Sequence, residues 1–208
     1  DGAEPFAGLT KVGDTLYGTT QGGGVPSKGA VFAIKLATGT ETAMYAFQGG
    51  SDGANPVAGV INVGGMLYGT TALGGGTGCG GAGCGTVFAL DPTTGAETVV
   101  YAFPNRRSGA APGELISVGN TLYGTTHAGG LGNCTTYDTI GCGTAFEVNP
   151  ATGKAKMLYS FAGGSDGADP AGALINVGGT LYGATNAGGD AASCESQVGC
   201  GTIFAITP

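Results

Sequence analysis

The six cysteines are the residues whose spacing most directly indicates chemistry. They form three local pairs, namely Cys79 with Cys84, Cys134 with Cys142, and Cys194 with Cys200. Cysteines this close together form a disulfide or supply part of a zinc site. A zinc ion would need ligands pooled from neighbouring pairs, which have unequal spacers of four, seven and five residues. We therefore predict three disulfides, with zinc as the alternative, and a location outside the cell or at the cell surface.

Few other residues could carry out catalysis. His127, the only histidine, follows a Tyr-Gly-Thr-Thr segment, and similar segments precede Gln21, Ala72 and Asn186. We interpret His127 as a surface loop residue and not as a catalytic base. Glu147 comes closest to an acid in an apolar setting, but a strand residue turned towards a rim explains it equally well. The sequence predicts no catalytic residue, no cofactor and no enzymatic activity.

Two acidic segments could bind calcium. Residues 51–56 and 165–170 read Ser-Asp-Gly-Ala-x-Pro and place oxygen atoms of Asp52 and Asp166 close to other ligands. Calcium loops have this composition, but Asp-Gly is also a favoured turn. A third copy has Ser108 in place of the acid. We favour turns and predict no metal site, with calcium as the alternative.

The chain is a tandem array. Leu-Tyr-Gly-Thr/Ala-Thr occurs four times, with its tyrosines 51, 55 and 59 residues apart, at Tyr17, Tyr68, Tyr123 and Tyr182. A small residue, an apolar residue and Phe recur at Phe32, Phe88, Phe146 and Phe204, and Gly-Ala-x-Pro ends at Pro5, Pro56, Pro112 and Pro170. A period of 50 to 60 residues is typical of propellers and repeat arrays. We expect one repeat domain, residues 1–208, with repeats at about 1–50, 51–106, 107–164 and 165–208.

Each repeat predicts four short antiparallel strands. In the second repeat we expect them at 58–63, 66–71, 86–90 and 97–103. Strands such as Val87-Phe88-Ala89-Leu90 are apolar on both faces, which indicates that both faces are covered. Stacked blades would cover them. We predict an all-β, four-bladed β-propeller of about fifteen strands.

The fourth repeat differs from the others at its end. The aromatic-x-Phe phrase of the last strand occurs at Tyr45, Tyr101 and Tyr159 and has no fourth copy. We therefore expect the fourth blade to lack its outer strand. Its third strand would then expose unpaired backbone groups. That edge is either merely short and solvated, or it is completed by a strand from another chain.

The composition excludes several classes of partner. Charged residues make up 10% of the chain, against about 25% in an average soluble domain. The net charge is −7 and no basic run occurs, so nucleic acid is not an expected partner. No apolar stretch approaches the roughly 20 residues of a membrane helix, so we expect no membrane insertion.

The order of these phrases resembles the blades of quinoprotein-type and kelch-like propellers. More closely, the repeat resembles the Gloeo/Verruco tandem repeat (GloVer) through its Leu-Tyr-Gly-Thr-Thr, Gly-Thr-Val-Phe-Ala-Leu and Ser-Asp-Gly-Ala-x-Pro segments, across essentially all 208 residues. The resemblance implies an extracellular bacterial protein, and the family carries no enzymatic role that could be transferred to this chain.

Two functions rank ahead of an enzyme such as a lyase or hydrolase, which is the third alternative because propellers host enzymes as well. The first is a non-catalytic extracellular structural or adhesive propeller that self-associates head to tail into a polymer through its incomplete last blade. The second is a lectin-like propeller that binds a glycan through the cysteine-bounded loops, which vary while the strands repeat.

Overall fold

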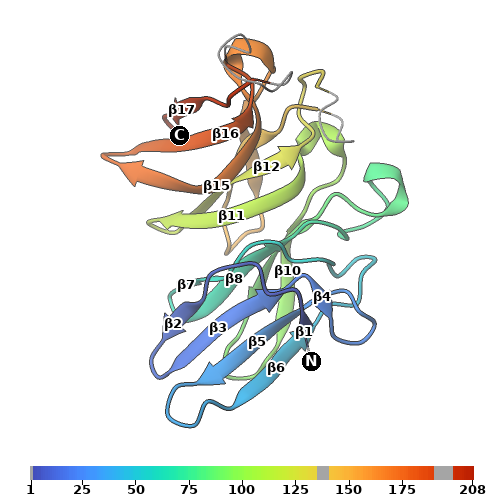
Figure 1. The fold of residues 1–208 in the computed structure, drawn as a ribbon, viewed down its shortest axis with the longest axis vertical. Coiled ribbons are helices and arrows are strands. Elements are labelled where there is room, and N and C mark those ends of the chain that lie inside the picture. The colour runs from blue at the N-terminus through green and yellow to red at the C-terminus, as the bar shows by residue number, and fades with distance from the viewer. Residues whose placement is uncertain (1, 135–140, 190–198) are drawn as a thin grey trace. The chain divides into compact units, whose positions relative to one another are not determined.

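The structure, a computed structural model, describes residues 2–134, 141–189 and 199–208. It divides into two compact units, Asp1–Ala102 and Phe103–Pro208. The boundary falls close to the predicted end of the second repeat at residue 106. Each unit therefore contains about two sequence repeats, and Figure 1 colours them from blue to red along the chain.

The first unit contains two four-stranded antiparallel sheets and a two-stranded ribbon. The first sheet has the order β2-β3-β5-β6, the second sheet has the order β7-β8-β9-β10, and β1 pairs with β4 (Figure 1). The bounds are β1 Gly2–Ala3, β2 Thr10–Val12, β3 Thr15–Thr20, β4 Gly22–Gly23, β5 Ala30–Lys35, β6 Glu41–Ala46, β7 Ile61–Val63, β8 Met66–Thr71, η1 Cys79–Gly81, β9 Thr86–Leu90 and β10 Glu97–Ala102.

The second unit contains the third and fourth sheets. The third sheet has the order β11-β12-β13-β14, and the fourth has the order β15-β16-β17 with three strands among the described residues. The bounds are η2 Arg106–Ser108, β11 Ala110–Val118, β12 Thr121–Ala128, β13 Thr144–Val148, β14 Ala155–Ser160, η3 Gly164–Asp166, β15 Ala168–Val177, β16 Thr180–Ala187 and β17 Ile203–Ile206. Strand β15 of the fourth sheet contacts β11 and β12 of the third.

The predicted all-β class and antiparallel pairing are confirmed. In the second repeat, the predictions for 66–71 and 86–90 match β8 and β9, whereas the first strand is shorter than predicted and begins at Ile61. Upstream of it, Ala54 forms only an isolated bridge with Leu73. In the second unit the corresponding strands β11 and β15 extend upstream through a register shift. The prediction of a single domain stays a prediction.

A glycine and a phenylalanine face each other in the middle of every sheet. The glycine of each Leu-Tyr-Gly segment is the cross-strand partner of the phenylalanine of the next strand, in the pairs Gly18–Phe32, Gly69–Phe88, Gly124–Phe146 and Gly183–Phe204. The ring lies over the glycine, because a Cβ built on Gly69 would stand 2.5 Å from Cζ of Phe88. The two sequence phrases therefore recur together because one supplies the ring and the other the space for it.

A second phenylalanine packs from the neighbouring sheet onto the ring of Phe88 in the first unit and onto the ring of Phe204 in the second. In the first unit, Phe47 follows β6 and packs edge-on against Phe88, with ring centroids 5.1 Å apart. In the second unit, Phe161 packs against Phe204 at 4.9 Å. The aromatic-x-Phe phrase of one repeat thus fills the core beside the Gly-Thr-x-Phe phrase of the next. Edge-to-face pairs add to the stabilisation from burying the rings.

Candidate interaction surface

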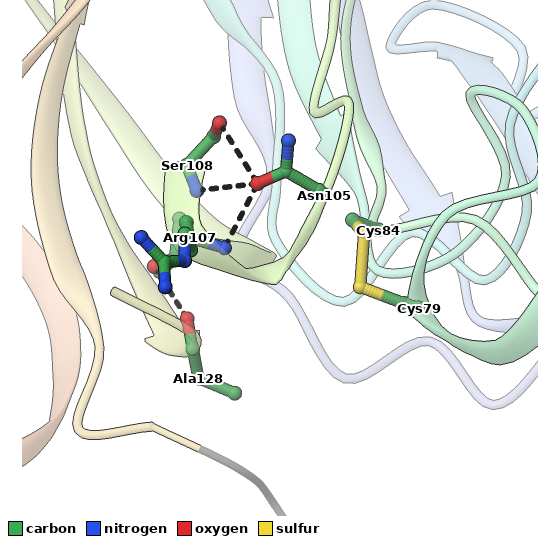
Figure 2. Close-up of a disulfide and its surroundings, with 7 residues drawn as sticks. Cys79, Cys84, Asn105, Arg107, Ser108 and Ala128 are labelled. Atoms are coloured by element: carbon green, nitrogen blue, oxygen red, sulfur yellow. Dashed lines mark hydrogen bonds between the residues drawn. A yellow bond between two sulfur atoms is a disulfide. The ribbon is translucent and has the colours of Figure 1, made fainter. Parts of the chain in front are cut away.

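The predicted disulfides at two of the three cysteine pairs are present. Cys79–Cys84 has an S–S distance of 2.07 Å and Cys134–Cys142 one of 2.05 Å, and Figure 2 shows the first of them. Cys200 is also disulfide-bonded. Its predicted partner, Cys194, lies outside the described residues. Each small loop closed in this way stabilises the fold by about 2 kcal/mol, because the unfolded chain is restricted.

The loops considered for calcium use their carboxylates to hold turns. Asp52 Oδ2 accepts hydrogen bonds from the Gln48 backbone nitrogen at 2.6 Å and from the Tyr45 hydroxyl at 3.0 Å. Asp166 makes the same pair of bonds, with the Ala162 nitrogen at 2.7 Å and the Tyr159 hydroxyl at 2.6 Å. Within the described residues, no group of three or more His, Cys, Asp or Glu side chains could hold a metal ion. The geometry favours the turn interpretation.

In the copy that has no acid, an asparagine caps the turn instead. Asn105 Oδ1 accepts from the backbone nitrogens of Arg107 at 3.0 Å and Ser108 at 3.3 Å, as Figure 2 shows. Sequence reasoning missed this residue because it compared only the Ser-Asp-Gly position. The signal was present, since asparagine is a preferred residue for capping a short helical turn.

A pair of carboxylates meets beside Tyr45 in the first unit. Glu97, at the start of β10, lies close enough to Asp52 for their charges to interact, and burial and Asp52 together raise the pKa of Glu97 from 4.5 to about 7. Burial, the hydrogen bond to Asp52 and the charges of both acids also raise the pKa of Tyr45. Asp52 Oδ1 and Glu97 Oε1 are buried without a hydrogen-bond partner among the described residues. The pair is therefore most stable when Glu97 is protonated.

The stability of the folded protein should depend on whether the Glu97 carboxyl group is protonated. The folded protein holds this proton more tightly than the unfolded chain, so the free energy of unfolding is expected to fall as pH rises from about 4.5 to about 7. Between these two pH values, the Glu97→Gln variant should lose about 2 kcal/mol less unfolding free energy than the wild type. This figure is smaller than the full pKa shift would give, because solvent screens part of the interaction. Chemical denaturation between pH 4 and 8 measures the effect. Glu41→Gln, at the equivalent exposed position of β6, is the control and should keep the wild-type slope. An unchanged slope in the Glu97 variant would contradict the assignment.

The prediction that His127 is a loop residue is wrong. His127 lies in β12, because β11 begins as early as Ala110 and pairs with β12 as far as Ala128. Its Nδ1 lies 2.9 Å from Asp169 Oδ1, and the Asn186 amide donates to Asp169 Oδ2 at 3.0 Å. Burial alone would raise the pKa of Asp169, but these hydrogen bonds outweigh it and lower the pKa. No serine or cysteine of the described residues hydrogen-bonds to His127, and the pair joins the third sheet to the fourth.

Glu147 is a strand residue with a basic neighbour. It lies in β13 directly across from Lys156 of β14, and its Oε1 stands 3.9 Å from the lysine Nζ. Both side chains line an open hollow with Asn149, Thr152 and Lys154. From the sequence, Glu147 was either an acid in an apolar setting or a strand residue turned towards a rim. Its pairing with Lys156 on the surface fits the strand residue.

The fourth sheet has one open edge and one apolar face. Among the described residues, β17 pairs with β16 on one side and with no strand on the other. The large apolar side chains exposed on this sheet are Ile175 at 60%, Val177 at 59%, Tyr182 at 39% and Ile203 at 86%. Cross-strand pairs link Ile175 to Tyr182, Tyr182 to Ala205, and Ala184 to Ile203. Directly opposed residues point to the same side of a sheet, so these side chains form one continuous surface.

Sequence reasoning did not locate this surface. The repeats predicted the open edge, but not that one face of the sheet would be exposed.

No helix of the described residues is long and apolar enough to span a membrane.

Comparison with solved structures identifies the fold. The extracellular domain of the putative one-component system BT4673 from B. thetaiotaomicron is 14% identical with a TM-score of 0.56, over 86% of this chain and 20% of that one. The calcium-binding protein regucalcin from Agrobacterium tumefaciens is 16% identical with a TM-score of 0.51, over 88% and 51%. The chain thus spans between a fifth and a half of these structures, which are propeller-like all-β proteins. No curated protein sequence matches the chain.

The repeat itself is assigned by a family model. The model of the Gloeobacter/Verrucomicrobia repeat matches twice, at residues 1–137 and 82–208, and the two matches together span the whole chain. The resemblance seen in the repeated segments is thereby confirmed, and the chain belongs to the Gloeobacter/Verrucomicrobia repeat family.

Proposed function

We propose that the chain is a non-catalytic extracellular β-propeller module of four blades with a structural or adhesive role. In this proposal each of the four sheets is one blade, and the fourth lacks an outer strand. The propeller-like neighbours and the repeat family support the architecture. The disulfides support an oxidising compartment, as does the extracellular neighbour. The structural roles of His127, Glu147 and Asp52 support the absence of catalysis.

The open edge of β17 is the observation that carries the self-association part of this proposal. Protected edges usually carry a charge, a proline or a bulge. Strand β17 reads Ile203-Phe204-Ala205-Ile206, with neither charge nor proline. In the third sheet the equivalent strand β13 pairs along its whole length with β14. A strand from a second copy would satisfy the unpaired groups of β17 in the same way.

The missing strand also leaves side chains of the neighbouring sheet uncovered. In the first unit, Glu97 of the outer strand β10 lies beside Tyr45. In the second unit, Tyr159 is equivalent to Tyr45, makes the same bond to an aspartate, and is 41% exposed. A strand added to β17 would cover Tyr159 as β10 covers Tyr45.

Self-association can be tested with the intact, oxidised chain. We expect the mass from light scattering to increase with concentration, and negative-stain micrographs of concentrated protein to show filaments. Hydrogen exchange should show β17 amides that exchange rapidly in dilute protein and slowly in concentrated protein, with β13 unchanged. A peptide of residues 155–161, the outer strand of the third sheet, should compete, whereas a scrambled peptide should not. Monodisperse monomers with unchanged β17 exchange at every concentration would refute self-association.

A further inference from the structure

The third repeat departs from the others at three charged positions, Glu147, Lys154 and Lys156. The other repeats carry an alanine or a threonine at each of them. The equivalents are Ala33, Ala89 and Ala205 for Glu147, Thr40 and Ala96 for Lys154, and Thr42 and Thr98 for Lys156. The repeated fold does not require these charges, since the other copies form the same strands without them.

The structure brings the three charged side chains together in one hollow. Glu147 of β13 is directly across from Lys156 of β14, and Lys154 lies two residues before Lys156 in the same hairpin. Side chains two residues apart along an extended chain point to the same side of a sheet. The hollow that they line has a volume of about 360 Å³. Ligand sites in proteins begin at about 300 Å³, so the hollow is large enough for a small ligand.

The hollow lies at the end of the third sheet opposite its disulfide. Strand β13 begins two residues after Cys142 and ends at Val148, beside the hollow. The hollow is formed within the second unit. Both lysines are exposed, and so are the two equivalent threonines of the first unit, where the outer strand of the following sheet is present. A strand added at β17 would therefore leave the hollow open.

The hollow concentrates positive charge on an acidic protein. Two of the seven Lys and Arg side chains line it, with a single carboxylate, whereas the whole chain has a net charge of −7. Lys156 pairs with Glu147 at 3.9 Å, and Lys154 makes no ion pair among the described residues. At physiological ionic strength, charges more than about 8 Å apart are largely screened. The local charges therefore decide what binds here, and they favour an anionic group.

The polar groups between the lysines favour a sugar over a bare anion. Thr121 and Thr152 supply hydroxyls, and Asn149 supplies an amide whose Oδ1 already accepts from the backbone nitrogens of Ala151 and Thr152. The amino group of that amide makes no hydrogen bond among the described residues and can donate to a ligand. Glu147, when ionised, can only accept. Its carboxylate would repel a phosphate ion, whereas a sugar hydroxyl would donate to it.

A second, smaller cavity adjoins the hollow on the same sheet. Tyr123 of β12 is the cross-strand partner of Glu147, and it lines a cavity of about 140 Å³ with Val118, Asn176 and Leu181. Directly opposed side chains lie on the same side of a sheet, so the two cavities meet at the pair of Tyr123 and Glu147. A ligand of more than one sugar unit can contact both. Tyrosine offers such a ligand an apolar ring and a hydroxyl.

We propose that the hollow around Lys154, Lys156 and Glu147 binds an acidic glycan. The anionic group of the glycan meets the two lysines, and its hydroxyls bond to Glu147 and Asn149. Lysine is a point charge without a preferred plane, so the anionic group is the carboxylate of a uronic acid or a sulfate ester. This inference goes beyond the proposed structural or adhesive role and does not require self-association. It places glycan binding at the opposite end of the sheet from the cysteine-bounded loops.

Titration of the full, oxidised chain with defined trisaccharides tests the proposal. Trigalacturonate carries carboxylates, a sulfated maltotriose carries sulfate esters, and maltotriose is the neutral control. Calorimetry at low salt and millimolar sugar should detect binding of at least one acidic sugar and none of maltotriose. Binding should weaken as sodium chloride is added, because exposed charges are screened. If neither acidic sugar binds, or if maltotriose binds equally well, the proposal is wrong.

A double variant that introduces the threonines of the first repeat tests the two lysines. Lys154→Thr with Lys156→Thr should raise the dissociation constant of the acidic sugar at least about tenfold, because charge-assisted hydrogen bonds are lost. The variant should fold normally, since the first sheet has threonine at both positions. Lys11→Thr with Lys28→Thr is the matched control, because both lysines are exposed outside the hollow and the same charge is removed. Equal binding by the two double variants would contradict the assignment.

Spectra that resolve single residues show where the sugar binds. In ¹H–¹⁵N correlation spectra, the acidic sugar should shift the amides of residues 147–156 and leave those of residues 79–84 unchanged. Shifts at the disulfide loop in place of the hollow would overturn the proposed site. Inorganic phosphate at the same concentration should not displace the sugar. Displacement would mean that the site recognises an anion alone, and the glycan proposal would fail.

Discussion

Phe88→Ala is expected to lower the free energy of unfolding by about 3–5 kcal/mol, the range seen when a buried aromatic side chain is removed. Phe88 is fully buried in the second sheet, between Gly69 on its own sheet and Phe47 from the first. Replacement by alanine would remove the free energy gained by transferring the ring from water and the edge-to-face contact. It would also leave an unfilled cavity in the core. A small domain has only about 5–15 kcal/mol of stability in total, so this is a large fraction.

Denaturant titration of the oxidised protein measures this change. Phe6→Ala is the control, because Phe6 is 74% exposed in the same unit. It should change the free energy of unfolding by less than about 0.5 kcal/mol in dilute solution. A loss below about 1 kcal/mol for Phe88→Ala would show that the ring does not fill the core as described.

Gly69→Ala is expected to destabilise the protein by about 1–3 kcal/mol, because a single added methyl group overpacks the core. Its Cβ would stand 2.5 Å from Cζ and 2.8 Å from Cε1 of Phe88, so the ring or the strand must shift. The measurement is again denaturant titration, with the slope compared to confirm that only stability has changed.

A matched glycine and a double variant check that mechanism. Gly8→Ala adds the same methyl group where no atom lies within 4 Å, and it should be neutral or slightly stabilising. In the double variant with Phe88→Leu, Gly69→Ala should cost less than it does alone, because leucine leaves room for the methyl group. Additive costs would mean that the glycine is required for another reason.

Much of the fold could be predicted because the chain repeats its own pattern. The strands expected at 58–63 and 66–71 leave residues 64 and 65 for the turn between β7 and β8, and Gly64 there has a φ of +61°, which favours glycine. Strands β8 and β9 were predicted residue for residue, since apolar runs bounded by turn residues leave little choice of register. The paired cysteines predicted the disulfides for a similar local reason, their short separation.

The failures arose where a residue's role depends on a partner distant in sequence. His127 was assigned to a loop because the strand was judged from its own segment, whereas the early start of β11 extends β12 past it. The raised pKa of Glu97 depends on Asp52, which lies 45 residues away in sequence. Neither contact leaves a mark in the local pattern of the chain.

The sequence by itself determined the repeat, the strands of its best copies and the two disulfides of the described residues. All of these are set by residues within one repeat. Only the tertiary structure decided which copy of a repeated residue is covered. Val31, Ala145 and Ile203 occupy the same position, yet the first two are fully buried and the last is exposed. The physical reason is that burial of a sheet face is a property of the neighbouring sheet and not of the strand that carries the side chain.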